Sequence, residues 1–296
     1  MTSGPLVLIA GCGYVGQRLA ARLRERFELI ALLRSSEKAM ALERQGVKTA
    51  VIDLDRVRAG ARIPERLDQE AIIYLAPPPG SGESDLRLDR FLQIAIVPPK
   101  TFLYMSTTGV YGDAGGALVD ESTPVRPLTD RARRRVSAEE MTRVWCHERH
   151  VRRVVLRVPG IYGPGRLPIG RLQKCEPVIR SEEAGISNRI HVDDLVSACE
   201  AAILNREARG VYNTTDGSSI SSTEFIDRVA QLTGMPRPPR VSMEEAQLTF
   251  SPERLSFLNE SRRVSNERML KHLGVKLQYT DIDAGIRASL PGAQAG

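Results

Sequence analysis

Aromatic residues and long apolar runs are both scarce in this sequence. Phe, Trp and Tyr together make up 5% of the 296 residues, so an aromatic-lined groove for single-stranded nucleic acid is not indicated. No apolar run approaches the roughly 20 residues that span a bilayer. The N-terminus lacks the basic leader and cleavage site of a signal peptide. We therefore expect neither a nucleic-acid partner nor a membrane partner.

Cysteine and histidine are also infrequent, with four of each. The cysteines at positions 12, 146, 175 and 199 form no C-x-x-C pair and do not group with histidines at metal-ligand spacing. We therefore expect no metal site, and reduced, buried thiols as in a cytoplasmic protein. The net charge of +6, from 42 basic and 36 acidic residues, fits an anionic small ligand as well as it fits nucleic acid.

Short apolar runs alternate with helical or loop segments through the first half of the chain. This alternation predicts a doubly wound parallel α/β sheet of the Rossmann type. We expect the dinucleotide-binding domain over 1–160 and a smaller C-terminal substrate lobe over 161–296, with a helix near 193–204 returning to the first domain. The strands of the sheet are expected at 5–13, 28–34, 49–55, 71–77, 101–107 and 153–160.

Three later segments carry local signals. Residues 191–204 have a helical apolar pattern with acidic residues in the first turn, and 210–216 is a strand candidate. Residues 221–234 open with Ser221-x-x-Glu224, which predicts a capping box, and close on a glycine. The Pro-rich segment 236–246 is typical of a linker.

Residues 11–16 read GCGYVG, a G-x-G-x-x-G pattern between an expected strand and an expected helix. The first glycine permits a tight turn, the second lets the backbone approach a pyrophosphate, and the third packs helix against strand. The helix N-terminus adds N–H groups and a positive dipole end. A glycine-rich turn without a ligand is the alternative. The expected cofactor-binding residues here are Gly11, Gly13, Tyr14, Val15 and Gly16.

The second strand ends in the sequence LRSS at 33–36. An NAD enzyme places Asp or Glu near this point to bind the ribose 2′-hydroxyl. Arg34 instead fits a 2′-phosphate, to which Ser35 can donate a hydrogen bond. We predict NADP as the cofactor, with NAD as the alternative if Arg34 is only a surface residue.

Further motifs follow in a definite order. They are Asp53 after the third strand, YLAPP at 74–78, STTGVYGD at 106–113, LRVPGIYGPGR at 156–166, NRIHVDDL at 188–195 and VYNTTDG at 211–217. In this order they resemble the extended short-chain dehydrogenases/reductases, which include the NAD-dependent epimerase/dehydratase group. The resemblance covers nearly the whole chain and is strongest to a short, atypical branch of sugar-nucleotide-epimerase-like proteins.

The resemblance implies roles for matching positions. Thr107 matches the Ser/Thr that hydrogen-bonds the reacting oxygen and is a candidate catalytic residue. Candidate substrate residues are Arg166, Arg189 and His191, although a structural hydrogen bond at the helix start is the alternative for His191. The cofactor residues implied in the same way are Asp53, Leu54, Leu75, Ala76, Pro77, Ser106 and Pro159.

The family's Tyr-x-x-x-Lys pair, which a glutamate follows within a turn, is absent. Counting back from Glu139 puts Arg135 at the Lys position and Arg131 at the Tyr position, and counting from Glu140 gives valine and alanine. Arginine is a poor proton shuttle because its pKa lies above roughly 12. Its donors can hold ribose hydroxyls or an anion. We therefore expect Arg135 to bind the cofactor and Arg131 the substrate.

Other interpretations of this arginine cluster and of the missing proton donor stay open. Arg133 and Arg134 fit a solvated helix face, while neighbouring glutamates argue against a nucleic-acid patch. Tyr111 is a candidate relocated catalytic acid, and Tyr162 is a second candidate on the substrate side. For each tyrosine, a packing role in the wall of the site is the alternative.

These observations favour an NAD(P)-binding oxidoreductase or epimerase/dehydratase-like enzyme. Its substrate is expected to be small and anionic, with nucleotide sugars as one class, and a homodimer is compatible with the sequence. The alternative is a non-catalytic NADP(H)-binding sensor or regulatory protein, which the missing Tyr/Lys pair favours. The fold analogy carries much of the argument for an enzyme.

Overall fold

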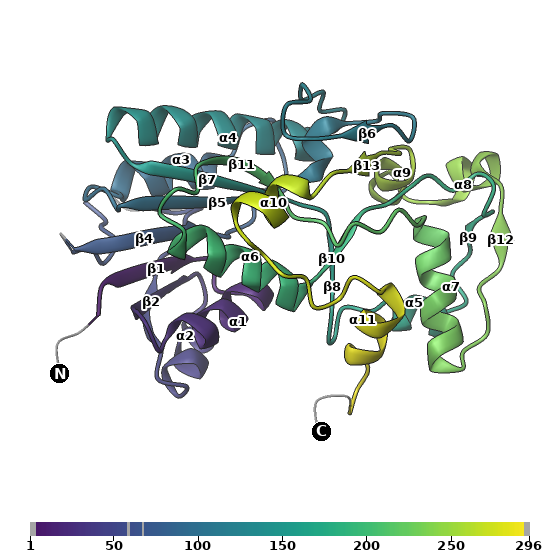
Figure 1. The fold of residues 1–296 in the computed structure, drawn as a ribbon, viewed down its shortest axis with the longest axis horizontal. Coiled ribbons are helices and arrows are strands. Elements are labelled where there is room, and N and C mark those ends of the chain that lie inside the picture. Colours follow the sequence, from purple (N-terminus) through teal and green to yellow (C-terminus); the bar gives the residue numbers. More distant parts are fainter. Residues whose placement is uncertain (1–3, 58–59, 67, 293–296) are drawn as a thin grey trace.

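A seven-stranded parallel sheet forms the centre of the protein (Figure 1). The computed structural model describes residues 4–57, 60–66 and 68–292. The strand order is β11-β7-β5-β4-β1-β2-β3, which confirms the predicted doubly wound α/β architecture. The strands are β1 (Leu6–Ala10), β2 (Glu28–Leu33), β3 (Lys48–Val51), β4 (Gln69–Tyr74), β5 (Thr101–Thr107), β7 (Arg152–Val158) and β11 (Gly210–Asn213).

Helices cover both faces of the sheet, so its central strands are apolar on both sides. Along β1, Val7 and Ile9 pack toward one set of helices, while Leu8 and Ala10 pack toward the other. The first face carries α1 (Tyr14–Leu23), α2 (Ser36–Glu43), α6 (Val192–Leu204) and α10 (Glu267–His272). The opposite face carries α3 (Leu86–Ile94) and the long α4 (Asp130–Glu148).

A smaller set of elements packs beside the carboxyl ends of the strands (Figure 1). Three two-stranded ladders pair β8 (Gly160–Tyr162) with β10 (Arg189–His191), β9 (Val178–Ile179) with β12 (Arg240–Val241), and β6 (Leu118–Val119) with β13 (Arg263–Val264). The helices here are α5 (Ile169–Gln173), α7 (Ser222–Thr233), α8 (Met243–Thr249), α9 (Pro252–Leu258) and α11 (Ile282–Ala288), and a short 3₁₀ turn, η1 (Thr108–Tyr111), follows β5.

Two elements from the second half of the chain lie with the central sheet. Strand β11 pairs in parallel with β7 and forms one edge of the sheet. Helix α6 packs against α1 and buries its apolar side there. The loops that follow β1, β4, β5 and β7 consequently gather at one end of the sheet, where the smaller elements face them.

The capping box predicted at the start of α7 forms only in part. The Ser221 side chain accepts the Glu224 N–H as expected, but the Glu224 carboxylate pairs with Arg228 one turn later, 3.0 Å away. A reciprocal box forms instead between Ser242 and Glu245 at the start of α8. The segment 236–246 is therefore not a plain linker, because it contains β12 and the first turn of a helix.

The thiols are less uniformly buried than the sequence suggested. All four cysteines are free, but Cys175 is exposed while the other three are buried. In the parts of the chain that the structure covers, we find no helix long and apolar enough to cross a membrane. The same residues contain no cluster of three or more metal-ligating side chains.

Candidate functional site

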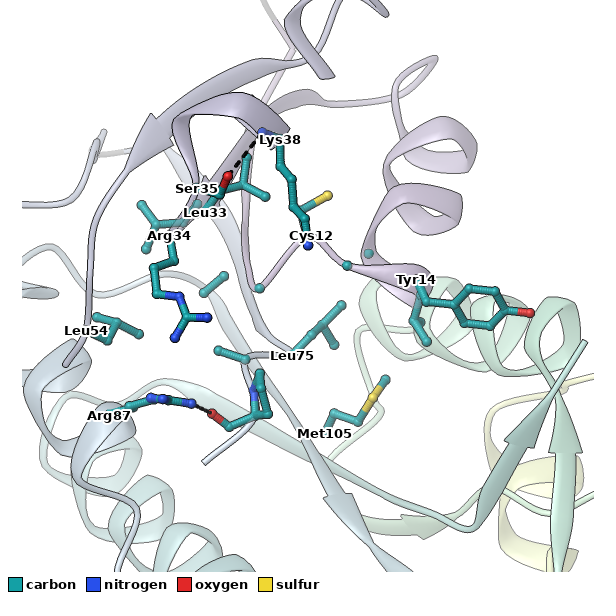
Figure 2. Close-up of a pocket in the computed structure, with 18 of the residues that line it drawn as sticks. Cys12, Tyr14, Leu33, Arg34, Ser35, Lys38, Leu54, Leu75, Arg87 and Met105 are labelled. Carbon is teal, nitrogen blue, oxygen red and sulfur yellow. Dashed lines mark hydrogen bonds between the residues drawn. The ribbon is translucent and has the colours of Figure 1, made fainter. Parts of the chain in front are cut away.

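A cavity of about 480 Å³ lies at the carboxyl ends of β1, β2 and β4 (Figure 2). We call it the cofactor cavity. It sits where the strand order reverses between β1 and β4, the usual ligand crevice of a doubly wound sheet. Most of the predicted cofactor residues line it, namely Gly11, Gly13, Tyr14, Val15, Gly16, Arg34, Ser35, Asp53, Leu54, Leu75, Ala76 and Pro77.

A Cβ atom would meet a different environment at each glycine of the 11–16 turn. Gly11 has φ +93°, and a Cβ there would collide with the backbone of Ala76 in the loop after β4. A Cβ on Gly16 would lie 3.1 Å from the Gly11 carbonyl oxygen, so only glycine lets the helix pack this closely. A Cβ on Gly13 would meet nothing within 4 Å and would project into open space.

The turn leaves the start of α1 ready for an anion. Among the residues described, no side chain caps α1 and no acidic residue lies in its first turn. The first-turn N–H groups of a helix have no partner within the helix, and its dipole end is positive. The turn therefore fits the diphosphate of a dinucleotide. Figure 2 shows the Tyr14 side chain pointing away from the cavity, where its hydroxyl donates to the Pro164 carbonyl, 3.0 Å away.

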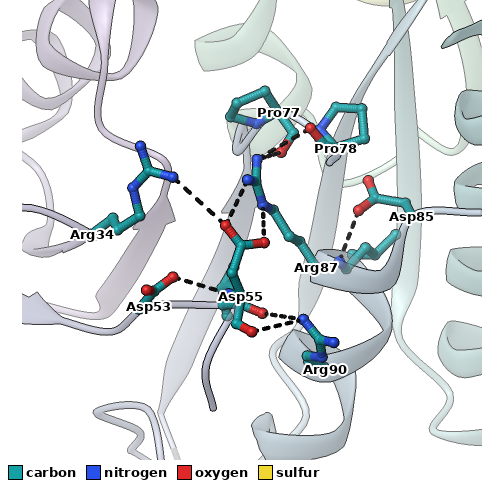
Figure 3. A network of polar contacts seen from close by, with 10 residues as sticks. Arg34, Asp53, Asp55, Pro77, Pro78, Asp85, Arg87 and Arg90 are labelled. Carbon is teal, nitrogen blue, oxygen red and sulfur yellow. Dashed lines mark hydrogen bonds and ion pairs between the residues drawn. The ribbon is translucent and has the colours of Figure 1, made fainter. Parts of the chain in front are cut away.

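A cationic rim borders this cavity near the ends of β2 and β3 (Figure 3). Arg87 donates to both carboxylate oxygens of Asp55, at 2.7 and 2.6 Å, and these bonds hold the pKa of Asp55 below its usual range. Arg34 lies 3.6 Å from the same carboxylate and is largely exposed. Lys38 also lines the cavity. Since Asp55 is engaged by Arg87, Arg34 and Lys38 remain able to meet an added anion.

A second cavity of about 360 Å³ adjoins the first and shares Ile161 and Arg166 with it. We call it the arginine cavity. Thr107 and Pro159 line it beside the cofactor cavity, and Glu260 lines it from the segment before β13. Its arginines are Arg131, Arg166, Arg171, Arg189 and Arg262. The predicted substrate residues Arg131, Arg166 and Arg189 are thus brought together.

Tyr111 lies behind the wall of the site. It is almost fully buried, and its hydroxyl donates to Asn213 Oδ1 at 2.8 Å. The Arg157 guanidinium lies over its ring, and burial raises the pKa of Tyr111. Tyr111 lines neither the cofactor cavity nor the arginine cavity. The structure therefore gives Tyr111 the packing role that was the alternative to catalysis.

His191 and the Tyr162 hydroxyl also point away from the arginine cavity. His191 is fully buried, its Nδ1 accepts the Asp193 N–H at the start of α6, and its Nε2 lies 3.2 Å from Ser289 Oγ. Burial lowers the pKa of His191, which keeps the ring neutral in this structural cap. The Tyr162 ring lines the cavity, but its hydroxyl is buried against Gly285 of α11.

Comparison with known proteins identifies the family of the chain. The model of the NAD dependent epimerase/dehydratase family matches residues 7–214, more than two thirds of the chain. The chain belongs to this family. A curated relative, the UDP-glucose 4-epimerase of Halalkalibacterium halodurans, is 24% identical over 90% of this chain and 93% of its own length.

Solved structures of similar fold extend over almost the whole chain. A conserved protein of unknown function from Silicibacter pomeroyi is 29% identical, with a TM-score of 0.81 over 96% of this chain and 97% of the other. The human epimerase family protein SDR39U1, solved with NADPH, is 19% identical with a TM-score of 0.76 over 96% and 98%. A Bacillus cereus UDP-glucuronic acid 4-epimerase, solved with UDP-glucuronic acid and NAD, is 18% identical with a TM-score of 0.76 over 96% and 97%.

Helix α4 directs Glu139, Arg135 and Arg131 toward the sheet and the arginine cavity. Glu139 faces the sheet. Its carboxylate accepts one hydrogen bond from Ser106 Oγ at 2.5 Å and two from Arg157 at 2.7 and 3.1 Å. Arg135, one turn earlier, donates to the Tyr104 hydroxyl at 3.0 Å and the Met105 carbonyl at 3.1 Å. One further turn back, Arg131 reaches the arginine cavity. Val136, which the alternative register would place at the Lys position, packs in an apolar cluster with Val110.

Three predicted cofactor residues do not line the cofactor cavity. Pro159 lines the arginine cavity, while Ser106 is buried against Glu139. Arg135 reaches the site only through its bond to the carbonyl of Met105, which does line the cofactor cavity. Ser106 and Arg135 therefore support the cavity wall from behind.

The structure adds site residues that the sequence did not single out. Lys38 could have been found, because a lysine in the first turn of a helix opposes the helix dipole unless an anion is present. The other additions depend on distant pairings. Arg87 meets an aspartate 32 positions away, and the Glu260–Arg262 pair lies in a segment without a recognisable motif.

Gly13→Ala tests the phosphate turn. The added methyl enters open space, so we expect the melting temperature to stay within about 2 °C of the wild type, since this would cost well under 1 kcal/mol. The same methyl occupies the place of the cofactor diphosphate, and dinucleotide affinity should fall about tenfold or more. Gly170→Ala, which also adds a methyl in open space but at a residue that lines neither cavity, is the control. Equal NADPH affinity of the two variants would contradict the assignment.

Glu139→Ala tests the buried ion pair. Its removal leaves the Arg157 charge buried without its partner, so the free energy of unfolding should fall by about 3–5 kcal/mol. Glu140→Ala removes the neighbouring surface pair with Arg143 and should cost about 0.5 kcal/mol or less. Chemical denaturation of both variants provides the measurement. Equal losses would show that the buried pair does not anchor α4.

Proposed function

We propose that this protein is an NADP-preferring oxidoreductase or epimerase/dehydratase-type enzyme that acts on a small anionic substrate. The observation that carries the proposal is the meeting of the cofactor cavity and the arginine cavity at Ile161 and Arg166, beside Thr107. The family of the chain and the shape of the phosphate turn support a nicotinamide dinucleotide in the first cavity. The excess of arginines supports an anion in the second.

The preference for NADP rests on the rim of the cofactor cavity. Arg34 and Lys38 are cations at the end of β2 and the start of α2, where an adenosine 2′-phosphate would lie. Ser35 caps α2 by accepting the Lys38 N–H, which holds this rim in place. Asp53 is tied back by accepting the Asp55 N–H at 3.0 Å, so it does not replace the acidic residue typical of NAD enzymes.

Glu260 is our candidate for proton exchange with the substrate. It is the one carboxylate among the described residues that line the arginine cavity. Its Oε2 pairs with Arg262 at 2.7 Å, and its Oε1 is buried without a hydrogen-bond partner. A carboxylate in such a cavity wall is a candidate general base. The bound dinucleotide would supply the hydride chemistry, and the Thr107 hydroxyl would orient the substrate oxygen.

A non-catalytic NADP(H) sensor is the second candidate function. The observation in its favour is that Tyr111, the Tyr162 hydroxyl and His191 all lie off the arginine cavity. Among the described residues of the arginine cavity, Glu260 is then the candidate left for proton exchange. Without such a group, the protein would bind the dinucleotide but not act as an enzyme. The position of this carboxylate relative to the nicotinamide decides between the two functions.

Arg34→Ala tests the cofactor preference. Loss of a charge-assisted bond to the 2′-phosphate should weaken NADPH binding by about 10- to 100-fold, since such bonds contribute about 1.5–3 kcal/mol. NADH affinity should stay nearly constant because NADH lacks this phosphate. Fluorescence titration of both cofactors gives the dissociation constants, and Arg44→Ala, at the exposed C-cap of α2, is the control. Wild-type protein that binds NADH more tightly than NADPH would overturn the proposal.

A crystal structure with bound NADPH tests the choice between enzyme and sensor. For an enzyme we expect Glu260 to lie within hydrogen-bond reach of the space over the nicotinamide, directly or through one water molecule. Arginines and apolar groups alone around that space would support the sensor. Either arrangement leaves the prediction for Arg34 and the 2′-phosphate to be judged separately in the same structure.

A further inference from the structure

We propose that the arginine cavity binds a compact ligand that carries at least two negative charges and no nucleoside. The inference deepens the proposed function and rests on it only in placing this ligand beside the cofactor. Phosphate esters and dicarboxylates share the required chemistry. The proposal differs from a nucleotide-sugar site because the charges, not a base, provide the anchor.

The charges around the cavity do not balance. Arg262 is paired with Glu260 at 2.7 Å, and Arg171 is paired with Glu176 at 3.1 Å. The other three, Arg131, Arg166 and Arg189, have no carboxylate within 4.0 Å in the described part of the chain. Three guanidinium groups therefore face one cavity without a paired counter-charge.

Two of these arginines are removed from water at a cost that a ligand would offset. Arg189 is only 7% exposed, and burial lowers the pKa of Arg189 to about 10. Burial also lowers the pKa of Arg131. A buried charge without a partner is strongly unfavourable, and an anion held by several donors compensates it. Buried Asp216 attracts Arg189 from outside the 4.0 Å range, which reduces the cost without supplying a contact.

Aromatic rings fix these guanidinium groups in place. Arg131 lies over the Phe257 ring, with 3.7 Å from its Cζ to the ring centroid, and Arg189 lies over Phe225 at 4.2 Å. Stacking orients the planar fork of an arginine toward carboxylate or phosphate oxygens. It also covers a face of each phenylalanine in the cavity wall. Those faces are then closed to the stacking of a nucleobase.

The size of the arginine cavity also favours a compact ligand. Its volume of about 360 Å³ lies near the lower end of the range for small-molecule sites, which is about 300–1,000 Å³. The three free arginines come from α4, from β10 and from the loop after β8, so they approach from different sides. Arg131 stands where the family has its tyrosine, close to Thr107 along the same cavity. One anionic group of the ligand would therefore lie at its reacting end.

Titration of the full-length protein with inorganic pyrophosphate tests the proposal. NADPH is first added to saturation so that the phosphate turn is filled, and NADPH affinity is measured on its own. Calorimetry should detect pyrophosphate binding, with acetate bound at least about tenfold more weakly. Arg131→Gln should weaken pyrophosphate binding about tenfold or more, because the ligand loses a charge-assisted contact. Arg133→Gln, on the same helix but paired with Asp130 at the surface, is the matched control.

The outcomes separate this proposal from the proposed function. If the protein binds NADPH but not pyrophosphate, the inference alone is overturned. The same holds if Arg131→Gln and Arg133→Gln change pyrophosphate affinity equally. If the wild-type protein does not bind NADPH but binds pyrophosphate, and Arg131→Gln weakens the binding of pyrophosphate, the cofactor proposal alone is overturned. Titration with UDP completes the test, since binding about tenfold tighter than pyrophosphate would show that the site does use a nucleoside. Retained melting temperatures establish that the variants are folded.

Discussion

The bidentate contact between Glu139 and Arg157 is the interaction on which the geometry of the site depends. It joins α4 to β7, and the Ser106 hydroxyl joins the same carboxylate to β5. A helix that is fixed in rotation at one residue presents the same face one and two turns away. Arg135 therefore supports the wall of the cofactor cavity, and Arg131 reaches the arginine cavity. Both arginines owe their positions to this buried pair.

The two arginines of α4 contribute positive charge to the site, Arg131 at the arginine cavity and Arg135 behind the wall of the cofactor cavity. A tyrosine would bring a titratable hydroxyl to the reacting centre, whereas Arg131 brings a permanent charge. The rest of the arginine cavity is also rich in positive charge. Arg166 and Arg189 add further positive charge, and Glu260 offsets only Arg262. This excess of positive charge is the reason for proposing an anionic substrate.

Sequence reasoning succeeded where a local backbone requirement selects the residue. The Rossmann-type sheet and the 11–16 turn were predictable because alternating apolar runs and a positive φ at Gly11 leave few alternatives. It failed where a side chain finds its partner far along the chain. Tyr111 looked available for catalysis, but its hydroxyl meets Asn213, which lies 102 positions later. Glu260 was not singled out because only folding brings it into the same cavity as Arg131.

The two cavities are also tied together mechanically. The Tyr14 hydroxyl, at the first residue of α1, donates to the Pro164 carbonyl in the loop that follows β8. Arg166, two residues on, lies over the Tyr14 ring at 4.6 Å and lines both cavities. The helix whose N-terminus borders the cofactor cavity is thus bound to the loop whose Arg166 lines both cavities. A shift of that loop would change the shape of both cavities at once, so the phosphate turn and the arginine cavity are structurally linked.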